Sequence, residues 1–119
     1  MSEEAEQIRL FNWARSWEDE IPELALLFHP PNGGFRHIST ARRMKALGVK
    51  AGVPDVFLPV ARDGYHGLVI EMKWGKNKPT KKQRGWIDAL RQQGYYVLVC
   101  WSCVEAKQVI LEYLEMGEG

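Results

Sequence analysis

The spacing of apolar residues changes several times along the chain between a helical and a strand period. Residues 4–17 carry apolar side chains at helical intervals, which predicts an amphipathic helix. Residues 24–29 form a short apolar run that predicts a strand. Residues 40–47 predict a short helix that ends at Gly48. The first part of the chain is therefore expected to fold as helix, strand and helix.

Two apolar runs in the middle of the chain predict a β-hairpin. They cover residues 56–60 and 67–72, and the polar segment between them contains Asp63-Gly64, a strong turn signal. The position of the turn in a hairpin fixes which residues of its two strands lie opposite each other. This turn therefore decides which charged residues face each other at the far end of the strands.

Two carboxylates and an amine meet at that far end. With the turn near Asp63, Asp55 lies opposite Glu71, where paired residues have Cβ atoms about 4.5 to 5.5 Å apart. Strand alternation places Lys73 on the same face as Glu71. Two carboxylates so close repel, and a divalent cation would remove the conflict. Mg²⁺ or Mn²⁺ prefers oxygen ligands and activates water beside a phosphate, so we expect either ion here.

The rest of the chain predicts a helix, a strand and a helix. Residues 80–93 are amphipathic and end at Gly94, residues 95–101 are β-rich and apolar, and residues 102–116 begin with a capping signal. Because the run 95–101 follows the hairpin through a helical crossover, it is expected to pair in parallel with residues 67–74. The pattern predicts an α/β fold, a mixed β-sheet flanked by helices.

The motif Gly-Val-Pro-Asp at 52–55, followed by Glu-Met-Lys at 71–73, resembles the PD-(D/E)XK nucleases. Within that superfamily the chain is similar to the virus-type replication and repair nuclease domain, VRR-NUC, and residues 29–55 are similar to its small stand-alone phage members. The resemblance covers nearly the whole chain. It implies one nuclease domain over residues 1–119, a restriction-endonuclease-like core, and metal-dependent cleavage of DNA.

The resemblance also implies a role for each motif residue. Asp55 and Glu71 would bind the metal ion together with the Met72 carbonyl, and Lys73 would position the attacking water or stabilise the transition state. The products would carry 5′-phosphate and 3′-hydroxyl ends. The family further has an acidic residue on its first helix and a glutamine after the motif, and both have candidates in this sequence.

Glu6 is the candidate for the acidic residue on the first helix. It shares a helix face with Leu10 and Trp13, so its carboxylate is expected to point inward. Exposed acids usually lie on the opposite face. We interpret Glu6 as a metal ligand, with Glu3 or Glu4 in its place if the helix begins later than expected.

Gln83 is the candidate for the glutamine, and we include it among the catalytic residues. It shares a stripe with Trp86 and Ile87, on the side of its helix that packs inward. Thr80, three residues earlier, makes a capping box with it, and capping alone would also explain the residue. We interpret the tryptophans themselves as packing residues rather than base-stacking ones, namely Trp13, Trp17, Trp86 and Trp101.

Basic residues are concentrated beside the expected metal site, although the formal net charge is only +1. Residues 36–50 hold five basic side chains and no acidic one, and residues 71–91 hold seven against two. This segregation predicts a basic surface around an acidic pocket, as binding to a phosphate backbone requires. The expected nucleic-acid-binding residues are Asn32, Arg36, Lys45, Lys50, Lys76 and Lys78.

The composition excludes several other classes of protein. The chain has 119 residues, 45% hydrophobic and 26% charged, which is typical of a soluble globular protein. The acidic first residues do not form a signal peptide, and no apolar run approaches the roughly 20 residues that span a bilayer. We expect a cytoplasmic protein of a bacterial or phage-infected cell, with no membrane partner and no nucleotide cofactor.

A redox or zinc site is the main competing interpretation. Cys100 and Cys103 form a CxxC motif between a strand and a helix, where a reactive thiol can arise. Too little chain follows for a thioredoxin-like fold, and a second cysteine pair is missing, so we interpret the motif as structural, with Ser102 as a helix cap. The histidines lack paired ligand spacing, though a place near the metal site stays open for His29 or His37.

Two functions from different classes remain. The first is a structure-selective endonuclease, expected as a homodimer that cuts branched DNA like a Holliday-junction resolvase in replication, recombination or repair. The second is a catalytically silent nucleic-acid-binding module on the same core. The intact Asp55, Glu71 and Lys73 favour the enzyme. A dimer would form through the first helix or through the last helix, with its apolar residues Val109, Ile110, Tyr113 and Leu114.

Overall fold

The structure of the protein is a computed structural model that describes residues 1–31 and 38–118. Across these residues the elements follow in the order α1 (Glu3–Trp17), the 3-10 helix η1 (Pro22–Leu26), α2 (Ile38–Ala46), β1 (Val56–Leu58), β2 (Leu68–Met72), α3 (Lys81–Gln92), β3 (Tyr96–Cys100) and α4 (Cys103–Leu114). The predicted α/β fold is confirmed. None of the helices in the described part is both long and apolar enough to traverse a lipid bilayer.

The three strands form one mixed sheet in the order β1-β2-β3. β1 and β2 are antiparallel with Val56 opposite Ile70, and β2 and β3 are parallel. The hairpin turn contains Asp63 and Gly64 at φ angles of 49° and 83°, a left-handed conformation that Asp and Gly adopt more readily than other residues. The predicted hairpin, its turn and the parallel third strand are all confirmed.

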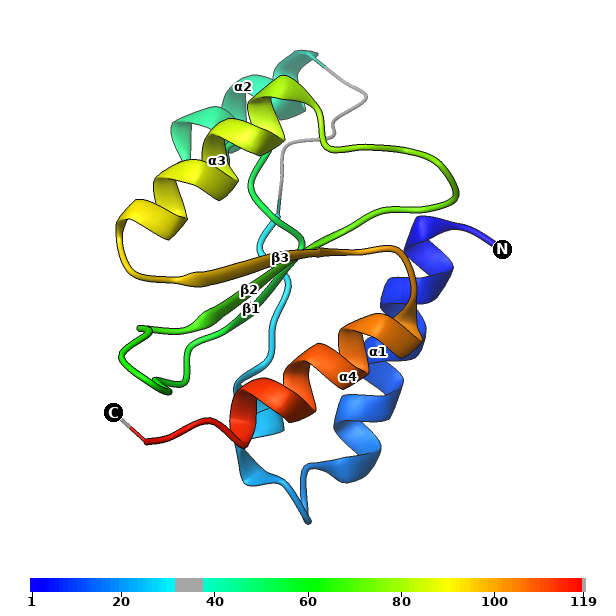
Figure 1. The fold of residues 1–119 in the computed structure, drawn as a ribbon. Coiled ribbons are helices and arrows are strands. Elements are labelled where there is room, and N and C mark those ends of the chain that lie inside the picture. Colours follow the sequence, from blue (N-terminus) through cyan, green and yellow to red (C-terminus); the bar gives the residue numbers. More distant parts are fainter. Residues whose placement is uncertain (32–37, 119) are drawn as a thin grey trace.

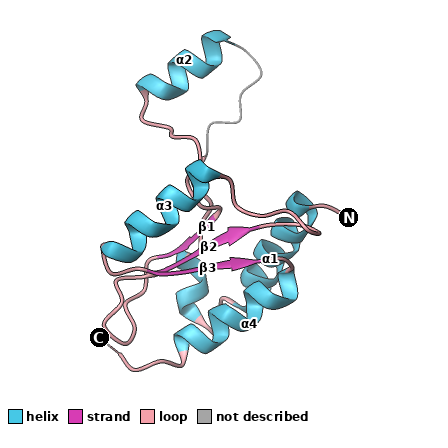
Figure 2. Ribbon diagram, turned by 45° about the horizontal axis from the view of Figure 1, so that its top comes forward, coloured by secondary structure: helices cyan, strands magenta, loops and turns pink. Residues whose placement is uncertain are grey.

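Helices cover both faces of the sheet (Figure 1). On one face, the even-numbered residues of β2 join α1 and α4 in the larger apolar core, which includes Leu10, Ile70 and Ile110. On the other face, Val69 packs with Ile87 of α3 in a smaller core. α3 lies between the sheet and α2, which stands apart from the other elements (Figure 2). β2 is therefore buried on both sides, and so are the charged residues at its end.

The strand predicted for residues 24–29 is wrong. Residues Pro22–Leu26 form a 3-10 helix, and Phe28 makes only an isolated bridge to Phe57. The buried residues are Leu24 and Leu27, which are three apart and match the period of a 3-10 turn rather than the period of two in a strand. Pro22 also suits the first turn of a helix, where its missing N–H costs nothing.

The tryptophans pack less than predicted. Trp13 contacts the larger core, but Trp17 is 47% exposed and Trp101 is 37% exposed, so the packing interpretation is wrong for these two. Trp86 is partly exposed and belongs to neither of the two core clusters that the described residues form.

The CxxC segment has a structural role, in agreement with the prediction. Cys100 ends β3 and Cys103 begins α4, and both thiols are buried and free. Ser102 caps α4, its hydroxyl accepting a hydrogen bond from the Glu105 N–H. Burial raises the pKa of Cys100 to about 12. A thiol that stays protonated at neutral pH is a poor nucleophile, so a redox role finds no support here.

Candidate active site

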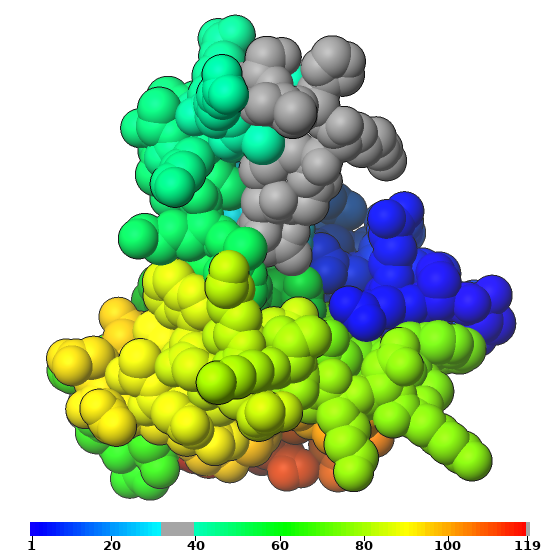
Figure 3. Space-filling view, turned by 90° about the horizontal axis from the view of Figure 1, so that it is seen from above, coloured from blue at the N-terminus to red at the C-terminus, as the bar shows by residue number. Residues whose placement is uncertain are grey.

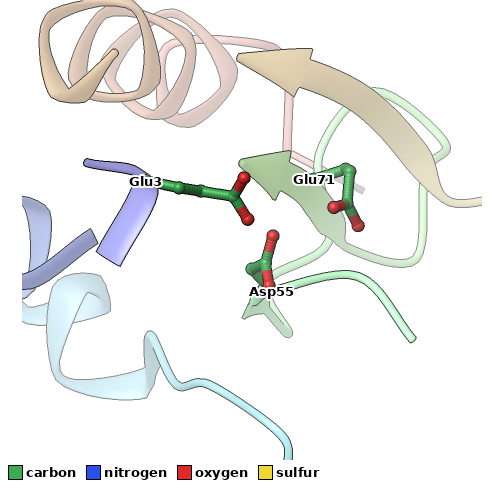
Figure 4. Close-up of side chains that lie close together, drawn as sticks. All are labelled: Glu3, Asp55 and Glu71. Carbon is green, nitrogen blue, oxygen red and sulfur yellow. The ribbon is translucent and has the colours of Figure 1, made fainter. Parts of the chain in front are cut away.

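Three carboxylates gather at the end of the β-hairpin that lies away from its turn (Figure 4). Glu3 comes from the first turn of α1, Asp55 directly precedes β1, and Glu71 lies in β2. One oxygen of each side chain lies within 4.8 Å of the others. Three segments that are far apart in the sequence thus supply one acidic cluster.

The hairpin register holds the central pair of this cluster. Because Val56 pairs with Ile70, continuing the ladder by one residue sets Asp55 opposite Glu71, as predicted. Asp55 is also fixed by a hydrogen bond, since its Oδ2 accepts from the Met72 N–H at 2.8 Å. One oxygen of Asp55 is therefore occupied by the backbone of the neighbouring strand.

Glu71 is buried without the hydrogen bonds that a carboxylate needs. It is 1% exposed, and neither of its oxygens has a hydrogen-bond partner among the described residues. The nearest cation is Lys73, whose Nζ lies 3.7 Å from Oε2, and Lys73 is itself only 7% exposed. A buried carboxylate without partners is costly, and a metal ion coordinated by the cluster would satisfy it.

The electrostatics of the cluster favour the same conclusion. Burial and the nearby Asp55 carboxylate raise the pKa of Glu71 from 4.5 to about 8, while Lys73 opposes the shift. Burial also raises the pKa of Glu3. Like charges crowded in a poorly solvated site resist ionisation, and a divalent cation reverses this by stabilising the charged forms. The donor set, all carboxylate oxygens, is the type that Mg²⁺ and Mn²⁺ prefer.

Glu6 points inward as predicted, but the structure brings Glu3 to the acidic cluster instead. The Glu6 side chain is buried and lies at the start of α4, where its Oε1 accepts from the Cys103 N–H at 3.0 Å. Its Oε2 forms an ion pair of 2.6 Å with Arg9. The carboxylate therefore joins α1 to the amino terminus of α4, which is a favourable position for a negative charge.

Gln83 takes part in the predicted capping box. Its Oε1 accepts from the Thr80 N–H at 2.9 Å, and the Thr80 hydroxyl accepts from the Gln83 N–H at 3.2 Å. The side-chain oxygen is thus engaged in starting α3. This contact explains the residue without a role at the metal site.

The predicted basic residues lie on two surfaces. Lys76 and Lys78 are exposed on the loop between β2 and α3, and this loop runs beside the amino-terminal end of α1 (Figures 1 and 3). Trp101 anchors this loop, because its indole N–H donates to the Asn77 carbonyl at 2.8 Å. The second surface is a hollow lined in part by Lys45 and Lys50. Two further predicted residues, Asn32 and Arg36, lie outside the described residues, as does His37.

His29 lies next to the acidic cluster, a position that the sequence left open. Its Nδ1 donates to the Asp55 carbonyl at 2.6 Å. The hydrogen bond joins the segment that contains His29 to the backbone of Asp55. His29 therefore helps to fix the position of Asp55.

Comparison with known proteins identifies relatives of this chain. A family model described as the VRR-NUC domain matches residues 1–103. A solved structure titled "VRR_NUC domain protein" is 30% identical in sequence, with a TM-score of 0.83, and the alignment covers 99% of this chain and 92% of that chain. No curated protein matches the sequence.

Proposed function

Because the chain belongs to the VRR-NUC family of nuclease-type domains, we propose that it is a DNA endonuclease dependent on Mg²⁺ or Mn²⁺. One observation carries the proposal: the buried Glu71 carboxylate has no hydrogen-bond partner among the described residues, yet lies within a cluster of three acids and beside Lys73. Such a group is expensive for a fold to keep unless it holds a cation.

Glu3, Asp55 and Glu71 would hold the ion, together with the Met72 carbonyl. When bound, Mg²⁺ or Mn²⁺ supplies a Lewis acid that lowers the pKa of water and offsets charge on a phosphate. Asp55 is already oriented for this role by its hydrogen bond to the Met72 N–H. Gln83, whose side-chain oxygen is engaged in the cap of α3, is assigned to the helix terminus rather than to catalysis.

Lys73 would act on the reacting phosphate. Its ammonium group is held 3.7 Å from Glu71, at the edge of the cluster. From there it orients the attacking water and stabilises negative charge that develops on the phosphate oxygens. The attacking water gives up a proton as its oxygen bonds to phosphorus, the bond from phosphorus to the 3′ oxygen breaks, and the 3′ oxygen takes up a proton. The products carry a 5′-phosphate and a 3′-hydroxyl.

The DNA backbone would lie along the basic residues that flank the cluster. Lys76 and Lys78, on the loop beside the amino-terminal end of α1, provide one side, and Lys45 and Lys50 provide the other (Figure 3). Exposed lysines bind phosphates through charge, so this surface holds the strand in place without selecting a sequence.

The test of the proposal is cleavage of labelled DNA by the purified protein. Four-way junction, flap, single-stranded and duplex DNA are each incubated with Mg²⁺, Mn²⁺ or EDTA and separated on a denaturing gel. We expect cleavage with either metal and none with EDTA, and the best-cut DNA identifies the preferred structure. Binding without cleavage under every metal condition would instead support a silent DNA-binding module.

Glu3 and Glu6 are expected to behave in opposite ways when each is replaced by glutamine. Glu3→Gln removes a metal ligand at a partly exposed position, so Mn²⁺ affinity should fall about 10- to 100-fold with little change in stability. Glu6→Gln loses the ion pair with Arg9 and weakens the cap on α4, so stability should fall by about 1–3 kcal/mol with Mn²⁺ affinity retained. Calorimetric titration with Mn²⁺ and urea unfolding measure the two effects. The reverse pattern would make Glu6 the ligand.

A homodimer that cuts symmetric junctions is also part of our proposal, and α1 is its best interface. Ile8 on α1 is 54% exposed and Phe28 nearby is 47% exposed, and both apolar side chains line the same hollow. In the last helix, by contrast, Ile110 and Tyr113 are fully buried in the core and cannot contact a second copy.

Light scattering after size-exclusion chromatography tests the dimer. We expect twice the mass of one chain for the wild type and a shift to monomer for Ile8→Glu, because a charge buried in an apolar interface is unfavourable. Val104→Glu, at a 68% exposed position on α4, is the matched control and should remain dimeric. A wild-type monomer at micromolar concentration would exclude this dimer and leave the nuclease proposal intact.

A further inference from the structure

A second feature of the surface lies between α2 and α3. Figure 2 shows α2 on the side of α3 away from the sheet. It is a hollow of ≈ 630 Å³, within the range of small-ligand sites in proteins. Its wall includes residues of α2, of the segment that leads to the acidic cluster, and of α3. The lining residues that matter here are Lys45, Lys50, Lys82 and Trp86.

The chemistry of the hollow is cationic and aromatic. Among the described residues that line it, three are lysines and none is acidic, so the hollow attracts anions. Trp86 adds a large aromatic surface that is only partly buried and lies outside both core clusters of the described residues. A positive groove with an exposed aromatic side chain is the arrangement by which proteins bind single-stranded nucleic acid, with phosphates on the cations and a base stacked on the ring.

Close packing ties the hollow to the acidic cluster. Gly52 has a φ angle of +86°, and a Cβ there would lie 2.7 Å from Lys82 Cγ and 3.3 Å from the Lys82 backbone carbon. The turn before Asp55 therefore touches the first turn of α3. Three residues from Gly52 to Asp55 span at most about 10 Å, which is the length of only a few nucleotides of one strand. A strand with one phosphate at the cluster thus reaches the hollow within a few nucleotides.

We propose that the hollow binds an unpaired nucleotide of the DNA strand that is cut, with its base stacked on Trp86 and its phosphate held by Lys45, Lys50 and Lys82. The inference rests on the proposed nuclease function and adds that a base near the scissile bond is unpaired when it enters the hollow. A duplex does not fit this role, because its base faces are already stacked on one another and only an unpaired base can place a face on the indole.

The experiment measures binding separately from cleavage. Duplexes with a single-stranded overhang carry one 2-aminopurine at successive unpaired positions, and a fully paired duplex carries it internally. Fluorescence titrations are run in EDTA with wild type, Trp86→Leu and Trp86→Phe, and Trp17→Leu is the control at another exposed tryptophan. Circular dichroism confirms that each variant is folded.

We expect wild type to quench 2-aminopurine at one or two overhang positions. Trp86→Leu should lose this quenching and bind the overhang about tenfold more weakly, with duplex affinity unchanged. Trp86→Phe should retain the quenching and the overhang affinity, and Trp17→Leu should match wild type in both measurements. Equal overhang binding by wild type and Trp86→Leu, or equal losses on overhang and duplex, would overturn the inference.

A second pair of variants tests the inference if Trp86→Leu does not fold. The double variant Lys45→Gln/Lys82→Gln should weaken overhang binding more than duplex binding, whereas Lys107→Gln on α4 should change neither. Parallel losses on both DNAs would contradict the inference. The outcome is independent of the cleavage test, because a protein that never cuts DNA can still show Trp86-dependent quenching, and an active nuclease can lack it.

Discussion

Replacing Lys73 by alanine is expected to lower the rate of DNA cleavage about 10²- to 10³-fold, the usual cost of losing one preorganised group that stabilises a transition state. Lys73 is only 7% exposed and lies 3.7 Å from Glu71, so its ammonium group is held in place before the substrate arrives. Lys76 and Lys78 on the neighbouring loop are exposed, so neither is held in the cluster as Lys73 is.

Single-turnover cleavage at saturating DNA and Mn²⁺ measures this effect apart from binding. The loss should appear in the rate constant and not in the DNA affinity, since an interaction made mainly in the transition state changes the rate. Lys107→Ala on α4 is the matched control and should cleave as wild type does. A Lys73→Ala rate within about twofold of wild type would remove Lys73 from the mechanism.

Replacing Glu71 by glutamine is expected to abolish cleavage and, at the same time, to change how the stability of the metal-free protein depends on pH. Cleavage should fall by about 10³-fold or more, because the metal loses its most buried ligand. The stability effect arises because Glu71 is 1% exposed and its pKa in the folded protein is raised to about 8 by burial and by Asp55.

The direction of the pH effect follows from proton binding. Between pH 4.5 and about 8 the folded protein keeps the Glu71 proton and the unfolded chain has lost it. The stability that this proton contributes is complete below pH 4.5 and is lost as the pH rises through about 8. Wild type without metal should therefore lose about 1.4 kcal/mol per pH unit in this window relative to Glu71→Gln, whose amide does not titrate.

Urea unfolding in EDTA at pH 6, 7, 8 and 9 checks this slope. The comparison concerns the slopes, because the buried amide of the variant changes the absolute stability by its own amount. Saturating Mn²⁺ should reverse the trend for wild type, since the bound ion favours the ionised carboxylate and binds more tightly as the pH rises towards 8. Parallel pH profiles for wild type and variant without metal would show that Glu71 titrates normally.

Features that depend only on neighbours in the chain could be predicted from the amino-acid sequence. Asp63-Gly64 fixed the hairpin turn, and a turn fixes the register, so the opposition of Asp55 and Glu71 and the common face of Glu71 and Lys73 followed from counting residues. The caps of α3 and α4 were readable for the same reason, because each involves residues three apart.

Tertiary structure decided which acid joins that pair. Glu3 and Glu6 both lie in the first turn of α1, and the inward periodicity of the helix selected Glu6. The packing of α4 against α1 set the Cys103 N–H beside Glu6, and the position of α1 at the sheet's end brought Glu3 to Asp55. The local pattern predicts that a side chain points inward, but not which group it contacts. For Glu6 that group is the Cys103 N–H, about 100 residues away in the sequence.

The same limit applies to the 3-10 helix and to the hollow. A short apolar run fits either a strand or a tight helix, and only the contacts of Leu24 and Leu27 with the core select the second. Trp86 reads as a packing residue from its helical stripe, yet α3 turns it towards α2 and not into the core. Turns and helix caps follow from local residues. The contacts of a side chain, and the choice between two backbone conformations that the local residues both allow, are set by elements that fold onto the segment from elsewhere in the chain.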